Sequence, residues 1–166
     1  MTESPSSANV ASWFRGRLPD DWFGAAPEIT VDRDEILVVG SLPSVEGGAD
    51  AAAGRIARFR EETRERRIAI AREAEERFDR KVAWGAECGG QTALFTTLSV
   101  PVMTRLRQPE RRVLDTLVDA GVARSRSHAL AWCVRLVGQH TDEWLTALRT
   151  AMEEVERVRD QGPPAA

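Results

Sequence analysis

The sequence is poor in the residue types that carry most enzyme chemistry. It contains no tyrosine, two histidines and two cysteines in 166 residues. His128 and His140 are the only general bases of the usual kind, and neither lies in a sequence pattern with a nucleophile or a carboxylate. The sequence also contains no cofactor-binding motif. We therefore expect no catalytic residues, no cofactor and no enzymatic activity.

Long apolar runs and a signal peptide are also lacking, so we expect a protein that neither spans a membrane nor is exported. Cys88 and Cys133 do not have the C-x-x-C spacing of a metal or redox site, and the pair fits a reduced, cytoplasmic protein. Asp32, Asp34 and Glu35 form an acidic group that could hold a divalent cation. A charged turn is far commoner, and we expect no metal site.

The charge of the chain is unevenly distributed. The net charge is −3, which argues against a protein that coats nucleic acid uniformly. Residues 99–138, however, contain seven arginines and three acidic residues, a local charge of +4. Because the rest of the chain is acidic, this segment is the candidate electrostatic footprint for nucleic acid.

The same segment has a clear order of predicted elements. Residues 99–106 are rich in β-branched residues, which predicts a strand. Pro109 and Glu110 suit the start of a helix, since proline is tolerated in the first turn and an acidic side chain favours the positive helix end. Gly121 is the natural end of that helix.

A second helix follows, with Ser125 as its N-cap. Its apolar residues lie on nearly all sides rather than on one face: Ala129, Leu130, Trp132, Cys133, Val134, Leu136 and Val137. A helix that is apolar all round must be buried on nearly all sides. We therefore expect a second copy of the chain to cover it, as in a homodimer.

This order of elements resembles the ribbon-helix-helix family of DNA-binding proteins. The resemblance covers residues 96–138, about a quarter of the chain. The residues that carry it are Arg105-Leu106, Leu114-Asp115, Leu117-Val118-Asp119-Ala120-Gly121, Ser125-Arg126-Ser127 and Ala129-Leu130.

The resemblance implies an intertwined homodimer whose two strands form an antiparallel ribbon in the major groove of DNA. The start of the second helix would hold a phosphate. The implied DNA-binding residues are Met103, Arg105, Arg107, Arg124, Ser125, Arg126 and Ser127. The expected function is that of a DNA-binding transcriptional regulator.

A non-enzymatic adaptor or scaffold protein is the alternative. In that interpretation the same fold makes the dimer, and Pro101 and Met103 give the ribbon an apolar surface that binds protein instead of DNA. Nuclease treatment of a native pull-down separates the two hypotheses, since only the regulator loses its partners.

Two Trp-Phe pairs near the N-terminus have two interpretations. Trp13, Phe14, Trp22 and Phe23 are either part of the core or a docking motif for a protein partner. We favour the core, because scattered aromatic residues in broken segments are mostly buried.

The expected fold class is α+β, mainly α, with a C-terminal ribbon-helix-helix segment, an N-terminal β-hairpin and a long charged helix. The expected parts are a disordered leader over 1–12, the Trp-Phe segment and hairpin over 13–48, the charged helix over 51–84, the ribbon-helix-helix over 92–138, an amphipathic helix over 141–160 and a tail over 161–166.

Overall fold

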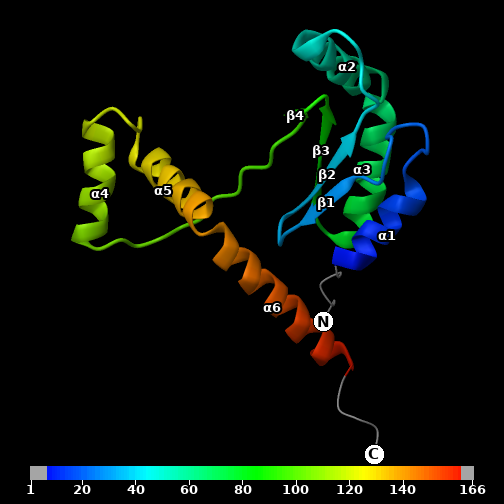
Figure 1. The fold of residues 1–166 in the computed structure, drawn as a ribbon. Helices are drawn as coiled ribbons and strands as arrows, with labels where there is room; N and C mark the ends of the chain where they lie inside the picture. Colours follow the sequence, from blue (N-terminus) through cyan, green and yellow to red (C-terminus); the bar gives the residue numbers. More distant parts are fainter. Residues whose placement is uncertain (1–6, 162–166) are drawn as a thin grey trace, which may run out of the picture. The chain divides into compact units, whose positions relative to one another are not determined.

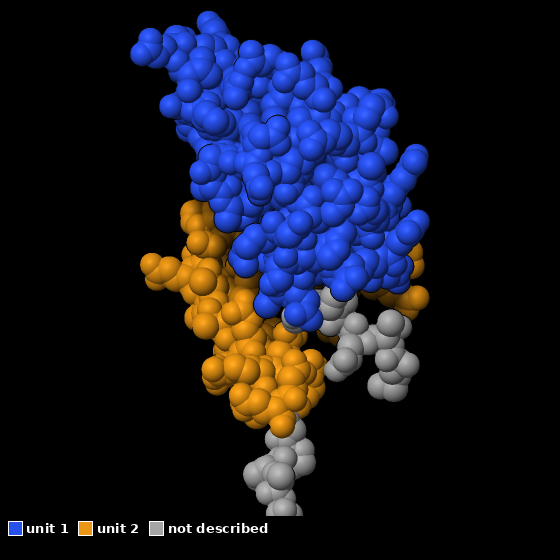
Figure 2. Space-filling view, turned by 90° about the vertical axis from the view of Figure 1, so that its right-hand side faces the viewer, with its two compact units in different colours: residues 1–102 blue, residues 103–166 orange. Residues whose placement is uncertain are grey.

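A computed structural model describes residues 7–161, and its contacts separate residues 1–102 (unit 1) from residues 103–166 (unit 2), which Figure 2 colours differently. Unit 1 contains α1 (Ser7–Arg17), β1 (Glu28–Val31), β2 (Glu35–Ser41), α2 (Gly48–Glu62), α3 (Arg64–Phe78), β3 (Lys81–Cys88) and β4 (Gln91–Leu94). Unit 2 contains α4 (Gln108–Asp119), α5 (Arg126–His140) and α6 (Asp142–Gln161). None of these helices is both long and apolar enough to cross a membrane.

The sheet of unit 1 is mixed, with the strand order β1-β2-β3-β4. A hairpin joins the antiparallel strands β1 and β2, and the Asp32 carboxylate closes its turn by accepting from the backbone N–H groups of Asp34 (2.8 Å) and Glu35 (2.7 Å). The acidic group is therefore a turn tip, with Asp32 as its organising side chain. β2 and β3 are parallel, so the chain must cross over between them, and it does so through α2 and α3.

The prediction of one continuous charged helix over residues 51–84 is wrong. This segment consists of α2 and α3, separated at Thr63, and its last residues belong to β3. Two interactions hold the junction: the Thr63 hydroxyl donates to the Phe59 carbonyl (2.6 Å), and Arg67 Nε donates to the Thr63 hydroxyl (3.0 Å). In the sequence, Thr63 and Arg67 interrupt the apolar stripe of the helical pattern. That pattern alone does not show that the charged Arg67 side chain is buried.

The core of unit 1 lies between the sheet and its helices, with α1 and α3 along one side of the sheet (Figure 1). Successive residues of β2 alternate between half-buried and fully buried, and Ile36 and Val38 point into the core. Phe23 packs its ring directly on Gly40, where a Cβ atom would lie 2.1 Å from a ring carbon. Glycine is required at that position because any side chain would collide with the ring.

The N-terminal aromatics belong to this core. Phe14 and Trp22 are buried, and the Trp22 ring makes edge contacts with Phe59 (5.6 Å) and Trp84 (6.1 Å). Trp13 and Phe23 are half-buried against the same cluster, and a protein partner for them stays a prediction. Residues 1–6 of the expected leader lie outside the described residues, whereas residues 7–12 are helical and bury Val10 completely.

The expected fold class is wrong in its central feature. The described residues contain six helices and a four-stranded mixed sheet in the N-terminal region, mainly α, and residues 99–106 contain no strand. Val102 and Met103 are 86% and 96% exposed, and Pro101 has no N–H group for a ladder. Residues 99–106 therefore alternate like a strand in sequence but pair with no other strand of the described chain, and they form part of the connection before α4 instead.

Unit 2 does contain the predicted pair of helices. α4 starts with Pro109 in its first turn, Gly121 has a positive φ of 74° just after the helix, and the Ser125 side chain caps α5. α6 follows after Thr141 and has no buried residue. Its large apolar side chains are exposed, apart from the half-buried Leu145.

We expect Trp22→Ala to lower the free energy of unfolding of unit 1 by about 3–5 kcal/mol, because the side chain is 4% exposed and leaves a large cavity. Val45→Ala is the control, since Val45 is 37% exposed on unit 1 and lies outside its core. Denaturant unfolding of both variants measures the difference. Equal stability of Trp22→Ala and the parent protein would contradict the place of Trp22 in the core.

Candidate functional site

A small core holds α4 against α5. Leu114, Ala123 and Ala129 are buried, and half-buried apolar residues such as Leu117 and Leu130 pack around them. The turn between the helices is closed by the backbone N–H groups of Val122 and Ala123, which both donate to the Leu117 carbonyl at 3.0 Å. This core fixes the direction in which the polar faces of the two helices point.

Four exposed arginines surround the start of α4: Arg105, Arg107, Arg111 and Arg112. Arg107 is the N-cap residue, and no side chain accepts a hydrogen bond from the first N–H groups of the helix. Arg111 donates to the Leu106 carbonyl (2.7 Å), which holds the entering chain near the helix. Since the helix dipole is positive at this end, the start of α4 combines four guanidinium groups with an uncapped helix N-terminus.

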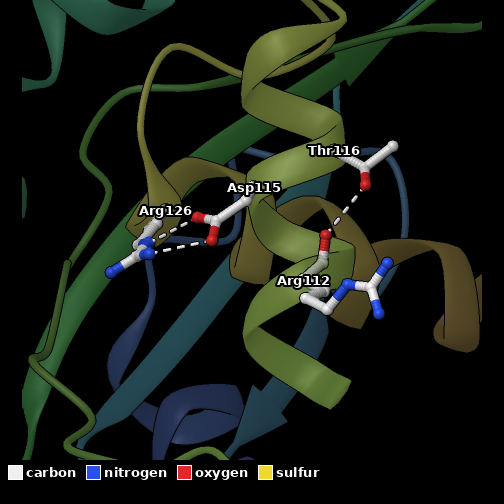
Figure 3. A network of polar contacts seen from close by, with 4 residues as sticks. All are labelled: Arg112, Asp115, Thr116 and Arg126. Atoms are coloured by element: carbon white, nitrogen blue, oxygen red, sulfur yellow. Dashed lines mark hydrogen bonds and ion pairs between the residues drawn. The ribbon is translucent and has the colours of Figure 1, made fainter. Parts of the chain in front are cut away.

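Arg126 is occupied by an ion pair instead. Its Nε and Nη2 groups donate to the two carboxylate oxygens of Asp115 at 2.6 and 2.9 Å, which joins the start of α5 to α4 (Figure 3). The hydrogen bond with Arg126 is the main cause that lowers the pKa of the Asp115 carboxyl and raises the pKa of Arg126. The Arg112 guanidinium points away from this network (Figure 3).

The start of α5 uses its polar groups to close the turn. The Ser125 hydroxyl accepts from the backbone N–H of His128 (3.2 Å), and His128 Nδ1 accepts from the backbone N–H of Arg124 (3.3 Å). Ser125 is therefore an N-cap, and His128 supports the turn that precedes the helix. The side chains of Arg124 and Ser127 are exposed.

The predicted DNA-binding residues fall into two groups. Arg105 and Arg107, together with the neighbouring Met103, precede α4, whereas residues 124–127 follow the turn at the other end of that helix. Sequence reasoning missed Arg111 and Arg112 as site residues. The i, i+4 spacing of Arg107 and Arg111 was the available signal, since it places both on one helix face.

Comparison with known proteins identifies the family. A family model described as "Rv1265-like protein, N-terminal domain" matches residues 8–94. The chain belongs to the Rv1265-like family. A second model, described as "Mb1296 C-terminal domain", matches residues 107–159, so the two matches fall in unit 1 and unit 2 respectively. No ribbon-helix-helix model matches, and the expected membership of that family is wrong.

Relatives in the Rv1265-like family align along nearly the whole chain. "Uncharacterized protein Rv1265" of Mycobacterium tuberculosis H37Rv is 59% identical over 167 residues, which cover 98% of this chain and 74% of the relative. "Uncharacterized protein Mb1296" of Mycobacterium bovis has the same identity and coverage. No solved structure matches the chain significantly.

The Asp115–Arg126 pair leads to a prediction about pH. We expect the folded-state pKa of Asp115 to lie below its ordinary value of 3.8, and Arg126→Gln to raise it. The pair's contribution to stability is then fully present above the unfolded pKa and is lost as the pH falls through the lower folded pKa. NMR titration of the Asp115 carboxyl measures the shift.

Arg112→Gln is the control for this titration, because the Arg112 guanidinium points away from Asp115. It should leave the Asp115 pKa low. An Asp115 pKa that is unchanged in Arg126→Gln would show that the ion pair does not form in solution.

Proposed function

We propose that unit 2 binds double-stranded DNA through an arginine surface at the start of α4, defined as Arg105, Arg107, Arg111 and Arg112. The observation that carries this proposal is that carboxylates of the described chain do not neutralise these arginines. Of the seven arginines in residues 99–138, only Arg126 forms an ion pair with a carboxylate within the part of the chain that the structure describes. Exposed, unpaired guanidinium groups bind phosphates and release the counterions of DNA, which drives association.

The chemistry favours contacts with the DNA backbone over contacts with the bases. Guanidinium groups around an uncapped helix start are typical phosphate-binding groups, and such contacts position a protein without reading sequence. Glu110 is the sole acidic residue between Arg105 and Arg112, so repulsion of phosphate is small there. At a promoter, such binding would make the protein a transcriptional regulator, and this role places it in the cytoplasm.

A second copy of the chain is the proposed partner of unit 2. α5 and α6 expose an apolar surface in the single chain, comprising Val134, Val137, Trp144, Leu148, Met152, Val155 and Val158. On α6, Leu145, Leu148, Met152 and Val155 recur at spacings of three and four residues, the pattern of a coiled-coil seam. Because such a seam is self-complementary, two copies can bury it, and the dimer then presents two arginine surfaces to one duplex.

The alternative function is that of a non-enzymatic adaptor. The exposure of Val102 and Met103 on the connection before α4 favours it, because two adjacent apolar side chains suit a protein partner. In this alternative the arginines are solvated and the duplex is not a ligand. The DNA-binding assay below decides between the two functions.

We expect the double variant Arg107→Gln/Arg111→Gln to weaken binding to unrelated duplexes alike, since phosphate contacts do not depend on sequence. The slope of log affinity against log salt should fall by about two units, roughly one for each lost contact. Fluorescence anisotropy with a labelled duplex at several salt concentrations measures both quantities. Circular dichroism verifies that the helices remain intact.

Arg33→Gln provides the control, because it removes one exposed arginine from the hairpin turn of unit 1. Its affinity and salt slope should equal those of the parent. If the parent protein does not bind DNA even at low salt, the DNA-binding proposal is wrong and the adaptor function replaces it.

The dimer leads to a separate prediction. Val134 is 65% exposed in one chain, so Val134→Asp should leave the fold of that chain intact while it places a charge in the proposed interface. We expect sedimentation velocity to show a dimer for the parent and a monomer for the variant. Val102→Asp, at an exposed position outside the seam, should remain dimeric. A monomeric parent protein at micromolar concentration contradicts the proposed interface.

A further inference from the structure

Unit 1 contains a cavity of about 680 Å³ that no part of the proposed DNA-binding function uses. It lies between α2, the start of α3 and the β4 region, and α2 and β4 contact each other. The volume falls within the range of about 300–1,000 Å³ that is usual for small-molecule sites. Its lining divides into a cationic side and an apolar side.

The cationic side is built around Arg67, which is 6% exposed. Its Nη2 donates to the Arg60 carbonyl (2.6 Å) and its Nε donates to the Thr63 hydroxyl (3.0 Å). No carboxylate within residues 7–161 lies at ion-pair distance from it. A guanidinium has five N–H donors, so these two bonds leave donors for a ligand. Burial of a charge without an opposite charge is costly, which favours an anion at this position.

Neighbouring charges strengthen the positive potential. Arg60 and Arg64 also line the cavity, against Glu61 as the acidic lining residue. Burial is the main cause that lowers the pKa of Arg67, and repulsion by Arg60 and Arg64 lowers it further. Arg64 pairs with the exposed Glu65 (2.8 Å), a surface ion pair that is easily broken. An anion in the cavity would relieve the repulsion among these cations.

The other side of the cavity is apolar. Ile56 and Ala57 come from α2, and Ala93, Leu94 and Phe95 come from β4 and the residue after it. The Phe95 ring lies 4.8 Å from the guanidinium carbon of Arg67, so the aromatic surface and the buried cation meet at one point of the cavity. A ligand that satisfies both sides must join an anionic group to an apolar body.

We propose that this cavity binds a small organic anion, with its phosphate or carboxylate group at Arg60 and Arg67 and its apolar body between α2 and β4. The site is independent of the arginine surface of unit 2, and neither proposal requires the other. Unit 1 is then a ligand-binding unit.

The test uses four probes that separate the two halves of the ligand. 1-Naphthyl phosphate and 1-naphthoate carry both halves, inorganic phosphate carries the anion, and 1-naphthol carries the apolar body. We expect isothermal titration calorimetry on the full chain to show one site per chain for at least one naphthyl anion. Its affinity should be at least about tenfold higher than that of phosphate or naphthol, equivalent to one charge-assisted contact. The ratio of the affinities for the two naphthyl anions shows whether the site prefers a phosphate or a carboxylate group.

Three variants locate the binding. Arg60→Gln should lower the affinity for the naphthyl anion about tenfold, because one charge-assisted contact is lost. Ala57→Trp should block the cavity without any change of charge, since Ala57 is exposed on α2 and lines it. Arg58→Gln is the control, because Arg58 lies on the same helix but does not line the cavity. A thermal melt of each variant verifies that unit 1 is folded.

Several results would overturn the proposal. These are the absence of binding by both naphthyl anions, equal binding of naphthol and the anions, or unchanged affinity in Arg60→Gln and Ala57→Trp. Arg60→Gln should also leave duplex binding unaffected. If duplex binding fails in this variant and neither naphthyl anion binds the parent, the cavity arginines serve nucleic acid and the small-anion site is wrong.

Discussion

The parallel pairing of β2 with β3 is the constraint on which unit 1 depends. Two parallel neighbouring strands cannot be joined by a tight turn. The chain therefore needs a crossover connection that returns it to the end of the sheet at which β2 begins. α2 and α3 provide it and cover the sheet with their apolar residues. The crossover must change direction, and it does so at Thr63.

That change of direction explains why a charged residue is buried. The break leaves carbonyl groups near the end of α2 without helical partners, and Arg67 donates to the Arg60 carbonyl and to the Thr63 hydroxyl. The same guanidinium lies against Phe95 just after β4, beside the cavity. The requirement of the sheet for a crossover therefore leads, through the helix break, to a buried cation at a ligand-sized cavity.

Unit 2 is subject to a different constraint, because it buries few apolar residues of its own. Three buried residues hold α4 against α5, and α6 buries none. A 20-residue helix gains little stability from propensity alone, and most helices owe their stability to packing of an apolar face. No element of the described chain buries the seam of α6, and this exposed seam is the basis of the proposed dimer.

The local features of this protein could be predicted from the amino-acid sequence, because they depend on residues close together in the chain. The Asp32 turn, Pro109 at the start of α4, the Gly121 turn and the Ser125 cap were all readable, since each involves contacts within a few residues. The concentration of arginine in residues 99–138 was readable for the same reason.

The pairing of strands and the burial of charges could not be predicted from the sequence and are visible in the folded chain alone. Residues 99–106 have a strand pattern but no partner strand within the described residues. In contrast, β3 (Lys81–Cys88) pairs with β2, although its first residues, 81–84, belong to the predicted helix. Arg67 resembles the solvated arginines of α3 in sequence, yet its contacts with Thr63 and Phe95 bury it. Pairing and burial depend on residues distant in the chain, and their free energy depends on the packed arrangement rather than on local pattern.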